Sequence, residues 1–539
     1  MTEFGALVED FLDAGWQHDP VEATRMGVHD YDRQLPVRTA DAMEEWGDRL
    51  EAFRRLFQRL DEGELSHDEK LDRAWALAVL DYELIRQEME PWRCSPQGPI
   101  EDVTYGLHSL LVGDFAPLDE RLESVLARLR SVPDFLKAAE VTLRSEAVPP
   151  AWLELALPQS RSAQRFIRDA VPAAAGERSG LAEEIREASQ AAAEAMSEFE
   201  SFLQEAGTAA QGDFAIGEDR FDRILQTFHM LDMDSHQLLE FGQEWIARYE
   251  RQMEEVAAEI EGGGDWIAGL EKVKDDHPQA ENLRKAYEDE TMLARRHCLE
   301  HDLITFPEGE RCTLEWTPAF MRSRVPIAQP RVSPPFEKGL DSEWYITPID
   351  PEAPEQEQRQ HLRDNSWPWI RGIAMHEIYP GHHLQLVIAK VKATPLRLRY
   401  WSPVFGEGWG LYTEELFYET GLLAPPRFRL MQLRNGLWRA VRILVDAGLH
   451  ARGMSVEEAA EQLSVRARLE PRWARSEALY YTTRPTYPSS YQLGFARLLD
   501  LREAYRSQKG DAFELKTFHD ELMSYSSLPL ALVEKEMLN

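Results

Sequence analysis

The chain of 539 residues carries 95 acidic and 60 basic side chains, which give a formal net charge of −35 at pH 7. This charge repels nucleic acids and anionic membranes, so neither is expected as a partner. Hydrophobic residues make up 43% of the sequence, enough for a large packed core. The three cysteines are too few and too far apart for a disulfide scaffold or a thiolate zinc site.

Residues 1–16 carry acidic side chains and lack the basic and then apolar pattern of a signal peptide. No stretch approaches the roughly 18 uninterrupted apolar residues that indicate a membrane span. We therefore expect a soluble, cytoplasmic protein.

Amphipathic helices dominate the prediction for the first three hundred or so residues. Apolar side chains recur at three- and four-residue spacing with charged residues between them. The clearest segments are 41–63, 68–90, 118–145, 179–207 and 235–264. Gly63, Pro133, Gly207 and the glycines at 262–264 are expected to separate helices. No fixed-period repeat is present, which disfavours a regular solenoid.

The amino-acid composition changes between residues 304 and 358, which are rich in proline, aromatic and β-branched residues. Residues 343–350, EWYITPID, are the best strand candidate, and residues 312–316, CTLEW, are the next. The segment 343–350 could offer an exposed edge to an extended peptide, although a plain edge strand explains it equally well.

The predicted fold class is mainly α, in one unit over residues 1–539. A mainly helical N-terminal lobe is expected over 1–303, a proline-rich β insert over 304–358, and a helical lobe that holds the candidate metal site over 359–539.

The sequence HEIYPGHH at 376–383 lies on a predicted helix that starts with Asn365 or Ser366 as its cap. In an unbroken helix, His376 and His383 would lie about 10 Å apart along the axis at ~1.5 Å per residue, which is awkward for two ligands of one ion. Pro380 removes the amide that would bond to the His376 carbonyl, and Gly381 permits unusual backbone angles. The break can therefore bring His382 or His383 beside His376.

Two glutamates complete the candidate site. Glu377 adjoins the first histidine, where a carboxylate beside a metal ion can take the proton of an attacking water. Glu407 lies on a second predicted helix within 405–421, far enough along the chain to fold back alongside the first. Two imidazoles and a carboxylate suit Zn²⁺, with other divalent transition metals as alternatives. Glu414, two turns after Glu407 on the same face, could orient a ligand histidine.

The segments HEIYPGHHLQ, FGEGWGLYTEEL and RPTYPSSYQLG resemble, in order, the motifs of DUF885, a bacterial family described as a domain of unknown function. The resemblance spans about residues 5–535. The family in turn resembles helical zinc metallopeptidases of the gluzincin kind, which implies a large two-lobed helical fold. Carried over, His376 and His382 would be metal ligands, Glu377 the base and Glu407 the third ligand. His383 is the alternative to His382 as the second metal ligand.

The sequence departs from the family motifs at two places. Gly410 stands where the second motif has alanine, and Tyr487 stands where the third has glutamine. In the third segment, Tyr491 is the candidate donor to an oxyanion and Tyr487 is the reserve. Arg484 could pair with a substrate carboxylate, with Tyr487 beside it.

These patterns predict a zinc-dependent hydrolase that cleaves short peptides, with a peptide or small amide as its substrate. One alternative is a metal-dependent amidohydrolase or esterase that acts on non-peptide substrates. The other is a catalytically silent helical binding protein that keeps a metal helix for stability.

Overall fold

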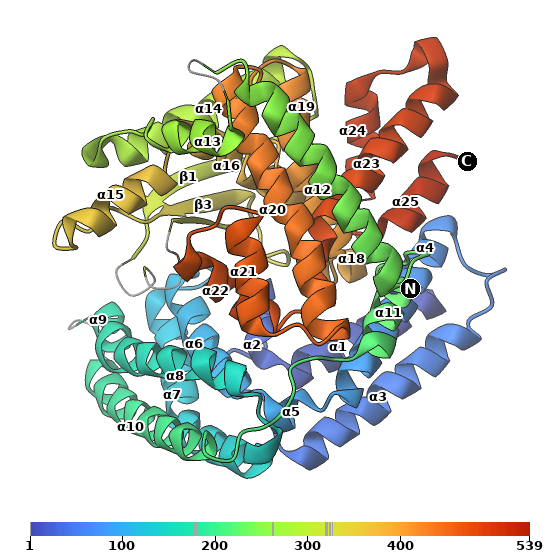
Figure 1. The fold of residues 1–539 in the computed structure, drawn as a ribbon. Coiled ribbons are helices and arrows are strands. Elements are labelled where there is room, and N and C mark those ends of the chain that lie inside the picture. The colour runs from blue at the N-terminus through green and yellow to red at the C-terminus, as the bar shows by residue number, and fades with distance from the viewer. Residues whose placement is uncertain are drawn as a thin grey trace. The chain divides into compact units, whose positions relative to one another are not determined.

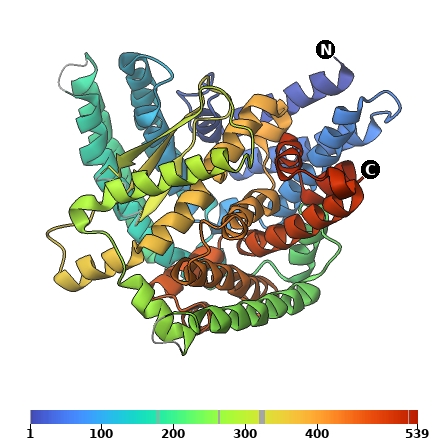
Figure 2. The ribbon, with the colours of Figure 1, turned by 90° about the horizontal axis from the view of Figure 1, so that it is seen from above.

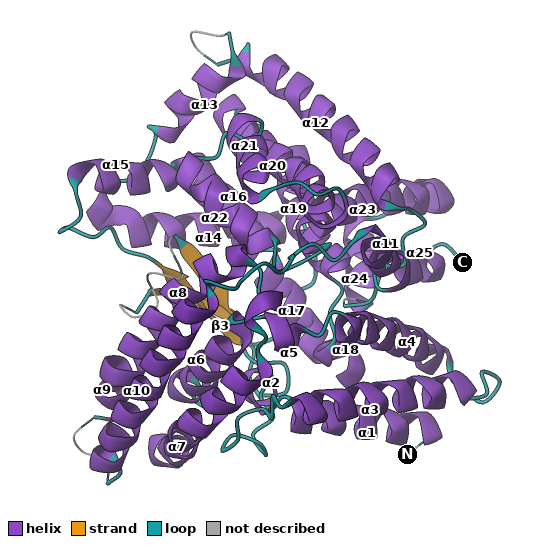
Figure 3. Cartoon of the chain, turned by 60° about the horizontal axis from the view of Figure 1, so that its bottom comes forward, coloured by secondary structure: helices purple, strands orange, loops and turns teal. Residues whose placement is uncertain are grey.

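The computed structural model describes residues 2–176, 180–260, 264–318, 322, 325, 327–525 and 527–539. Helices take up 71% of the chain and strands 3%, which confirms the mainly α prediction (Figure 3). Within the described ranges, no helix has both the length and the apolar character needed to cross a bilayer.

The chain forms two compact units. The first consists of Met1–Phe228, Pro334–Glu337 and Leu479–Thr483, and the second of His229–Ser333, Lys338–Ala478 and Arg484–Asn539. The three-part division at residues 303 and 358 stays a prediction.

The first unit is helical throughout its ordered elements (Figure 1). Its α-helices are α1 Glu3–His18, α2 Pro20–Met26, α3 Ala40–Arg59, α4 His67–Glu88, α5 Pro91–Cys94, α6 Gln97–Val112, α7 Leu118–Thr142, α8 Pro150–Arg165, α9 Val171–Ala175, α10 Ala182–Ala206 and α11 Glu218–Thr227. Local sequence sets several starts: Ser66 and Glu69, for example, form a capping box at α4.

Pro133 does not separate two helices, contrary to the prediction. Helix α7 runs through it, from Leu118 to Thr142. A proline inside a helix costs one backbone hydrogen bond. Here Leu129, Val132 and Leu136, on either side of the proline, are fully or almost fully buried, so packing offsets the loss.

The second unit contains the remaining elements. They are α12 Ser235–Ala257, α13 Trp266–Lys274, α14 Leu283–Glu300, β1 Arg311–Trp316, β2 Ala328–Arg331, β3 Asp341–Ile346, α15 Glu355–Asp364, α16 Trp367–Glu377, α17 His382–Lys392, α18 Pro395–Arg399, α19 Pro403–Glu419, α20 Pro426–Ala451, α21 Val456–Val465, α22 Pro471–Tyr481, α23 Tyr487–Lys509, α24 Leu515–Ser524 and α25 Leu530–Met537. The last residues of α22 belong to the first unit.

Helix α20 is the central element of the second unit, with almost every residue from Phe428 to His450 buried. The long helix α12, green in Figure 2, runs alongside the orange α20. Glycines let the two backbones approach: a methyl group on Gly242 would lie 2.8 Å from Ile443 Cγ2, and one on Gly436 would lie 2.5 Å from the Tyr249 ring.

The three strands form one sheet in the order β1-β3-β2, with β1 and β3 parallel and β2 antiparallel to β3. The predicted strand at 343–350 is therefore central and not an edge, and it ends at Ile346. The physical reason is burial on the sheet: Trp344, Tyr345 and Ile346 are all buried. Strand β2 was not predicted, because Pro330 weakens its strand signal.

Candidate metal centre

The predicted break in the histidine helix is confirmed. Helix α16 starts after Ser366 and ends at Glu377, and α17 starts at His382. The chain turns back so tightly that a Cβ on Gly381 would lie 1.8 Å from the His376 carbonyl oxygen. Helix α19 stabilises the turn, because Trp409 Nε1 donates to the Pro380 carbonyl at 2.8 Å. The break thus sets His376 and His382 next to each other, with ring centroids 5.0 Å apart.

A close approach of two other helices, α19 and α23, positions the carboxylate of Glu407. Helices α19 and α23 cross where a Cβ on Gly408 would lie 2.5 Å from the Gly494 Cα, and one on Gly494 would lie 1.8 Å from the Val404 carbonyl oxygen. Larger residues at this crossing would force the two backbones apart. The crossing positions Glu407 of α19 against Tyr487, whose hydroxyl donates a short hydrogen bond to Glu407 Oε1.

His376, His382 and Glu407 form the candidate metal centre. Their ligand atoms all lie within 4.8 Å of one another. Glu407 Oε2 is 3.3 Å from His382 Nε2 and 3.9 Å from His376 Nε2. Ligands in tetrahedral positions with bonds of ~2.0–2.1 Å are separated by about 3.4 Å. The donor types and their spacing therefore fit a single divalent ion such as Zn²⁺.

Glu414 holds the first histidine in the orientation that a ligand needs. Its Oε1 lies 3.0 Å from His376 Nδ1, so the opposite nitrogen, Nε2, faces Glu407. Both side chains are almost completely buried. The ring also lies against the backbone of α19, since a Cβ on Gly410 would lie 2.5 Å from His376 Cε1. Glycine at position 410 leaves room for this position of the ring.

The charges in this cluster are strongly coupled. Burial lowers the pKa of His376, but the carboxylates of Glu407 and Glu414 outweigh it and raise this pKa to about 9. Glu407 likewise raises the pKa of His382 against the effect of burial. Burial raises the pKa of Glu407, but the two imidazoles bring it well below its usual range. The carboxylate thus favours positive charge at this position, which a metal cation can supply.

The predicted base lies beside the cluster. Glu377 ends α16 and is partly exposed, and its charge contributes to the raised pKa values of both His376 and His382. It does not belong to the ligand group. Its role as a base stays a prediction.

The two predicted tyrosines lie on the α23 side of the centre. The ring of Tyr491 is stacked toward His376, with centroids 6.4 Å apart, and it meets Tyr487 edge-on at 5.9 Å. Burial, together with the charge of Glu407, raises the pKa values of both phenols above their usual range, so both are donors at neutral pH. Arg484 is exposed, and its guanidinium carbon lies 5.6 Å from the Tyr487 ring centroid.

His383 points away from the centre. Its Nδ1 lies 2.7 Å from Ser342 Oγ and its Nε2 lies 3.0 Å from Glu310 Oε2. Glu310 also accepts a hydrogen bond from Tyr379 and pairs with Arg295. The imidazole of His383 therefore joins α17 to the sheet, and His382 is the histidine that the structure brings to His376.

Two buried arginines near the centre were missed by the sequence analysis. The guanidinium carbon of Arg442 lies 4.7 Å from the Tyr491 ring centroid, and that of Arg439 lies 6.0 Å from it. Both also lie over the ring of Trp438, at 4.2 and 4.6 Å. The sequence alone gives little sign of them, because the five arginines of α20 do not look buried until the fold places the helix at the centre of its unit.

The family model described as a bacterial protein of unknown function, DUF885, matches residues 20–537. Two solved structures share the fold. One is a "putative lipoprotein of unknown function" from Shewanella oneidensis, with 21% identity, a TM-score of 0.84 and full coverage of both chains. The other, described in similar words, is from Colwellia psychrerythraea, with 17% identity, a TM-score of 0.87 and coverage of 99% of this chain and 98% of that one. No curated protein matches.

Proposed function

The chain belongs to the bacterial family of unknown function DUF885, and we propose that it is a zinc-dependent hydrolase that cleaves short peptides. The observation that carries this proposal is the buried group of His376, His382 and Glu407, whose ligand atoms lie within 4.8 Å of one another. The arrangement of two imidazoles and a carboxylate from a second helix agrees with the proposed kinship to gluzincin-type peptidases and their two-lobed helical fold.

Each residue of the centre has a role in this proposal. A bound divalent ion supplies Lewis acidity, which lowers the pKa of water and polarises a carbonyl group. Glu377 takes the proton of the attacking water and delivers it to the leaving amine. Tyr491 donates its hydroxyl hydrogen to the oxyanion that develops on the substrate. Tyr487 holds Glu407 through its hydrogen bond, and Arg484 lies at the exposed side, where it can pair with a substrate carboxylate.

The test combines metal analysis with one conservative variant. The purified protein is expected to hold about one zinc ion per chain, with its anomalous scattering at His376, His382 and Glu407. Glu377→Gln should keep the metal and lose about 10²–10⁴-fold in the rate of peptide hydrolysis, the usual contribution of a general base. Glu355→Gln, on the exposed start of α15, is the matched control and should keep the full rate.

The outcomes separate the alternatives. Full activity in Glu377→Gln would remove the base assignment. Cleavage of non-peptide amides or esters in place of peptides would favour the amidohydrolase or esterase reading. Stoichiometric zinc without hydrolysis of any substrate in a broad panel would favour the binding protein, and protein without bound metal would end the proposal.

The cytoplasmic location stays a prediction. The structural neighbours described as lipoproteins do not favour it. Fractionation of the native cells followed by immunoblotting would assign the protein to the cytoplasm, to the membrane fraction or to an exported fraction.

A further inference from the structure

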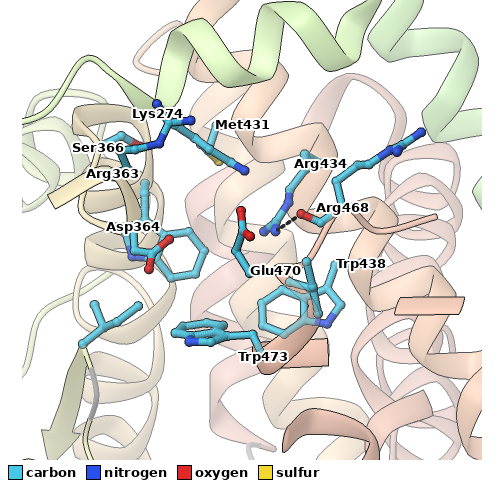
Figure 4. A pocket seen from close by; sticks show the side chains of 13 residues that line it. Lys274, Arg363, Asp364, Ser366, Met431, Arg434, Trp438, Arg468, Glu470 and Trp473 are labelled. Atoms are coloured by element: carbon cyan, nitrogen blue, oxygen red, sulfur yellow. Dashed lines mark hydrogen bonds between the residues drawn. The ribbon is translucent and has the colours of Figure 1, made fainter. Parts of the chain in front are cut away.

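A pocket that is partly open to solvent lies within the second unit (Figure 4). Its lining residues come from five stretches of the chain and include three tryptophans, two carboxylates and several basic side chains. They are Lys274, Ile327, Arg363, Asp364, Ser366, Trp369, Met431, Arg434, Trp438, Arg468, Leu469, Glu470 and Trp473. We call it the tryptophan–arginine pocket.

Arg434 is the most informative residue of the pocket. It is 8% exposed, and Figure 4 shows its guanidinium reaching into the pocket from α20. Its hydrogen bonds are long, 3.3 Å to Asn435 Oδ1 and 3.5 Å to the Arg468 carbonyl, and its buried Nε has no partner in the described part of the chain. A buried guanidinium with so much unused donor capacity is a site for a carboxylate, which accepts two parallel hydrogen bonds.

The pocket also presents negative charge. Asp364 accepts a hydrogen bond from Gln360, and no described cation lies within ion-pair distance of it or of Glu470. Burial raises the pKa of Asp364 to about 6, which shows how poorly its charge is compensated. Lys274 and Arg363 lie near but pair with Glu271 instead. Among the described residues, charges of both signs thus line one pocket, and the two carboxylates form no ion pair with its cations.

Indole rings form much of the remaining wall. Trp438 and Trp473 lie on the side of the pocket away from Lys274 in Figure 4, and Trp369 also lines the pocket. Met431 and Leu469 add apolar surface. Flat apolar walls of this kind bind aromatic groups by stacking and by excluding water.

We propose that the tryptophan–arginine pocket binds a small zwitterion with an aromatic side chain, namely a free aromatic amino acid or a short peptide of that kind. The carboxylate binds Arg434, the ammonium group binds Asp364 with Glu470 beside it, and the aromatic ring lies against the indoles. A molecule with both charges bridges groups that are held too far apart to pair with each other. This assignment does not depend on hydrolysis at the metal centre.

Calorimetric titration with three related probes tests the proposal. Phenylalanine carries both charges, N-acetylphenylalanine only the carboxylate and phenylalanine amide only the ammonium. Phenylalanine should bind at least tenfold more tightly than either of the other two, since one charge-assisted hydrogen-bonded contact is lost in each. Absence of phenylalanine binding at millimolar concentration, or equal binding of all three probes, would overturn the assignment.

Two variants identify the charged partners separately. Arg434→Met should weaken phenylalanine and N-acetylphenylalanine about tenfold or more and leave phenylalanine amide unchanged. Asp364→Asn should weaken phenylalanine and phenylalanine amide and leave N-acetylphenylalanine unchanged. Arg472→Met, on the exposed face of α22, is the control and should change none of the affinities. The melting temperature of each variant identifies a folding defect. In a variant that melts like the wild type, equal weakening of all three probes, or weakening of none, would show that the proposed pairing is wrong.

Discussion

Gly381 shows how one residue decides the geometry of the metal centre. The carbonyl oxygen of His376 occupies the space where a side chain at position 381 would begin, at 1.8 Å from an added Cβ. No rotamer relieves such an overlap, because both partners are main-chain or Cβ atoms. The closeness of the two imidazoles therefore depends on the absence of a side chain at this position.

Gly381→Ala should consequently displace His382 from His376. We expect the free energy of unfolding to fall by about 1–3 kcal/mol, as for other overpacked sites, and the zinc content to fall well below one ion per chain. Chemical unfolding and elemental analysis measure the two effects. Gly98→Ala, where an added Cβ meets nothing within 4 Å, is the matched control. Normal zinc content in Gly381→Ala would contradict this account of the turn.

Glu414 acts on the metal centre through His376. Glu414→Gln keeps the shape of the side chain but removes the charge next to His376 Nδ1. The affinity for zinc should fall about 10–100-fold, the usual effect of losing a carboxylate partner of a ligand histidine. Competition with a chromophoric chelator measures it, and Glu355→Gln serves again as the exposed control. An unchanged affinity would show that Glu414 does not orient the ring.

Most residues of the candidate metal centre could be proposed from the sequence, because its motifs are local, but the choice between His382 and His383 needed the family resemblance. His376, Glu377, His382 and Glu414 each stand at a fixed distance from a proline, a glycine or another acidic residue. The role of Glu310 could not be predicted in this way. It meets His383 from a distance of 73 positions along the chain, through the tertiary fold, and its own neighbourhood carries no motif.

Helix α23 depends on a side chain of another helix for its start. Asp446 of α20 is fully buried and accepts hydrogen bonds from the backbone amides of Thr486 and Ser489 and from the Ser489 hydroxyl. Burial raises the pKa of Asp446 to about 7, although these hydrogen bonds oppose the shift. The carboxylate caps the helix that carries Tyr487 and Tyr491, so α20 determines where both phenols lie.

Asp446→Asn should reveal this contact through pH. The folded pKa of about 7 lies above the unfolded value near 3.9, so the folded wild type holds an extra proton between these limits and loses stability as pH rises. Asparagine does not titrate. The destabilisation caused by Asp446→Asn should therefore shrink by about 2 kcal/mol between pH 5.5 and 7.5. Urea unfolding at the two pH values measures it, and a pH-independent difference would contradict the assignment.

At the scale of elements, the sequence predicted helices well and strands less well. The ends of helices were also harder to predict than the helices themselves, as the two prolines Pro133 and Pro380 show. The first lies inside a continuous buried helix, whereas the second is followed by Gly381, which allows the chain to turn. Strand β2 and the central place of β3 arise from pairing between distant segments, which local composition does not encode.

The whole molecule carries a net charge of −35, and its like charges repel one another when it is compact. Salt weakens this repulsion, since the screening length falls from roughly 20 Å at 20 mM to about 6 Å at 300 mM ionic strength. The melting temperature should rise by a few degrees over this range of sodium chloride. Sodium acetate at equal ionic strength should have the same effect, and a fall in melting temperature with both salts would contradict the expectation.

The contact between Gly408 and Gly494 has a mechanical consequence for the molecule. With no side chains between them, α19 and α23 pack backbone against backbone and carry Glu407, Tyr487 and Tyr491, while the two histidines belong to a different pair of helices. Any loosening of the second unit would separate the imidazoles from the carboxylate before it separated the carboxylate from the phenols. If the proposed ion is bound, its loss should therefore precede loss of the hydrogen bond from Tyr487 to Glu407 as the second unit unfolds.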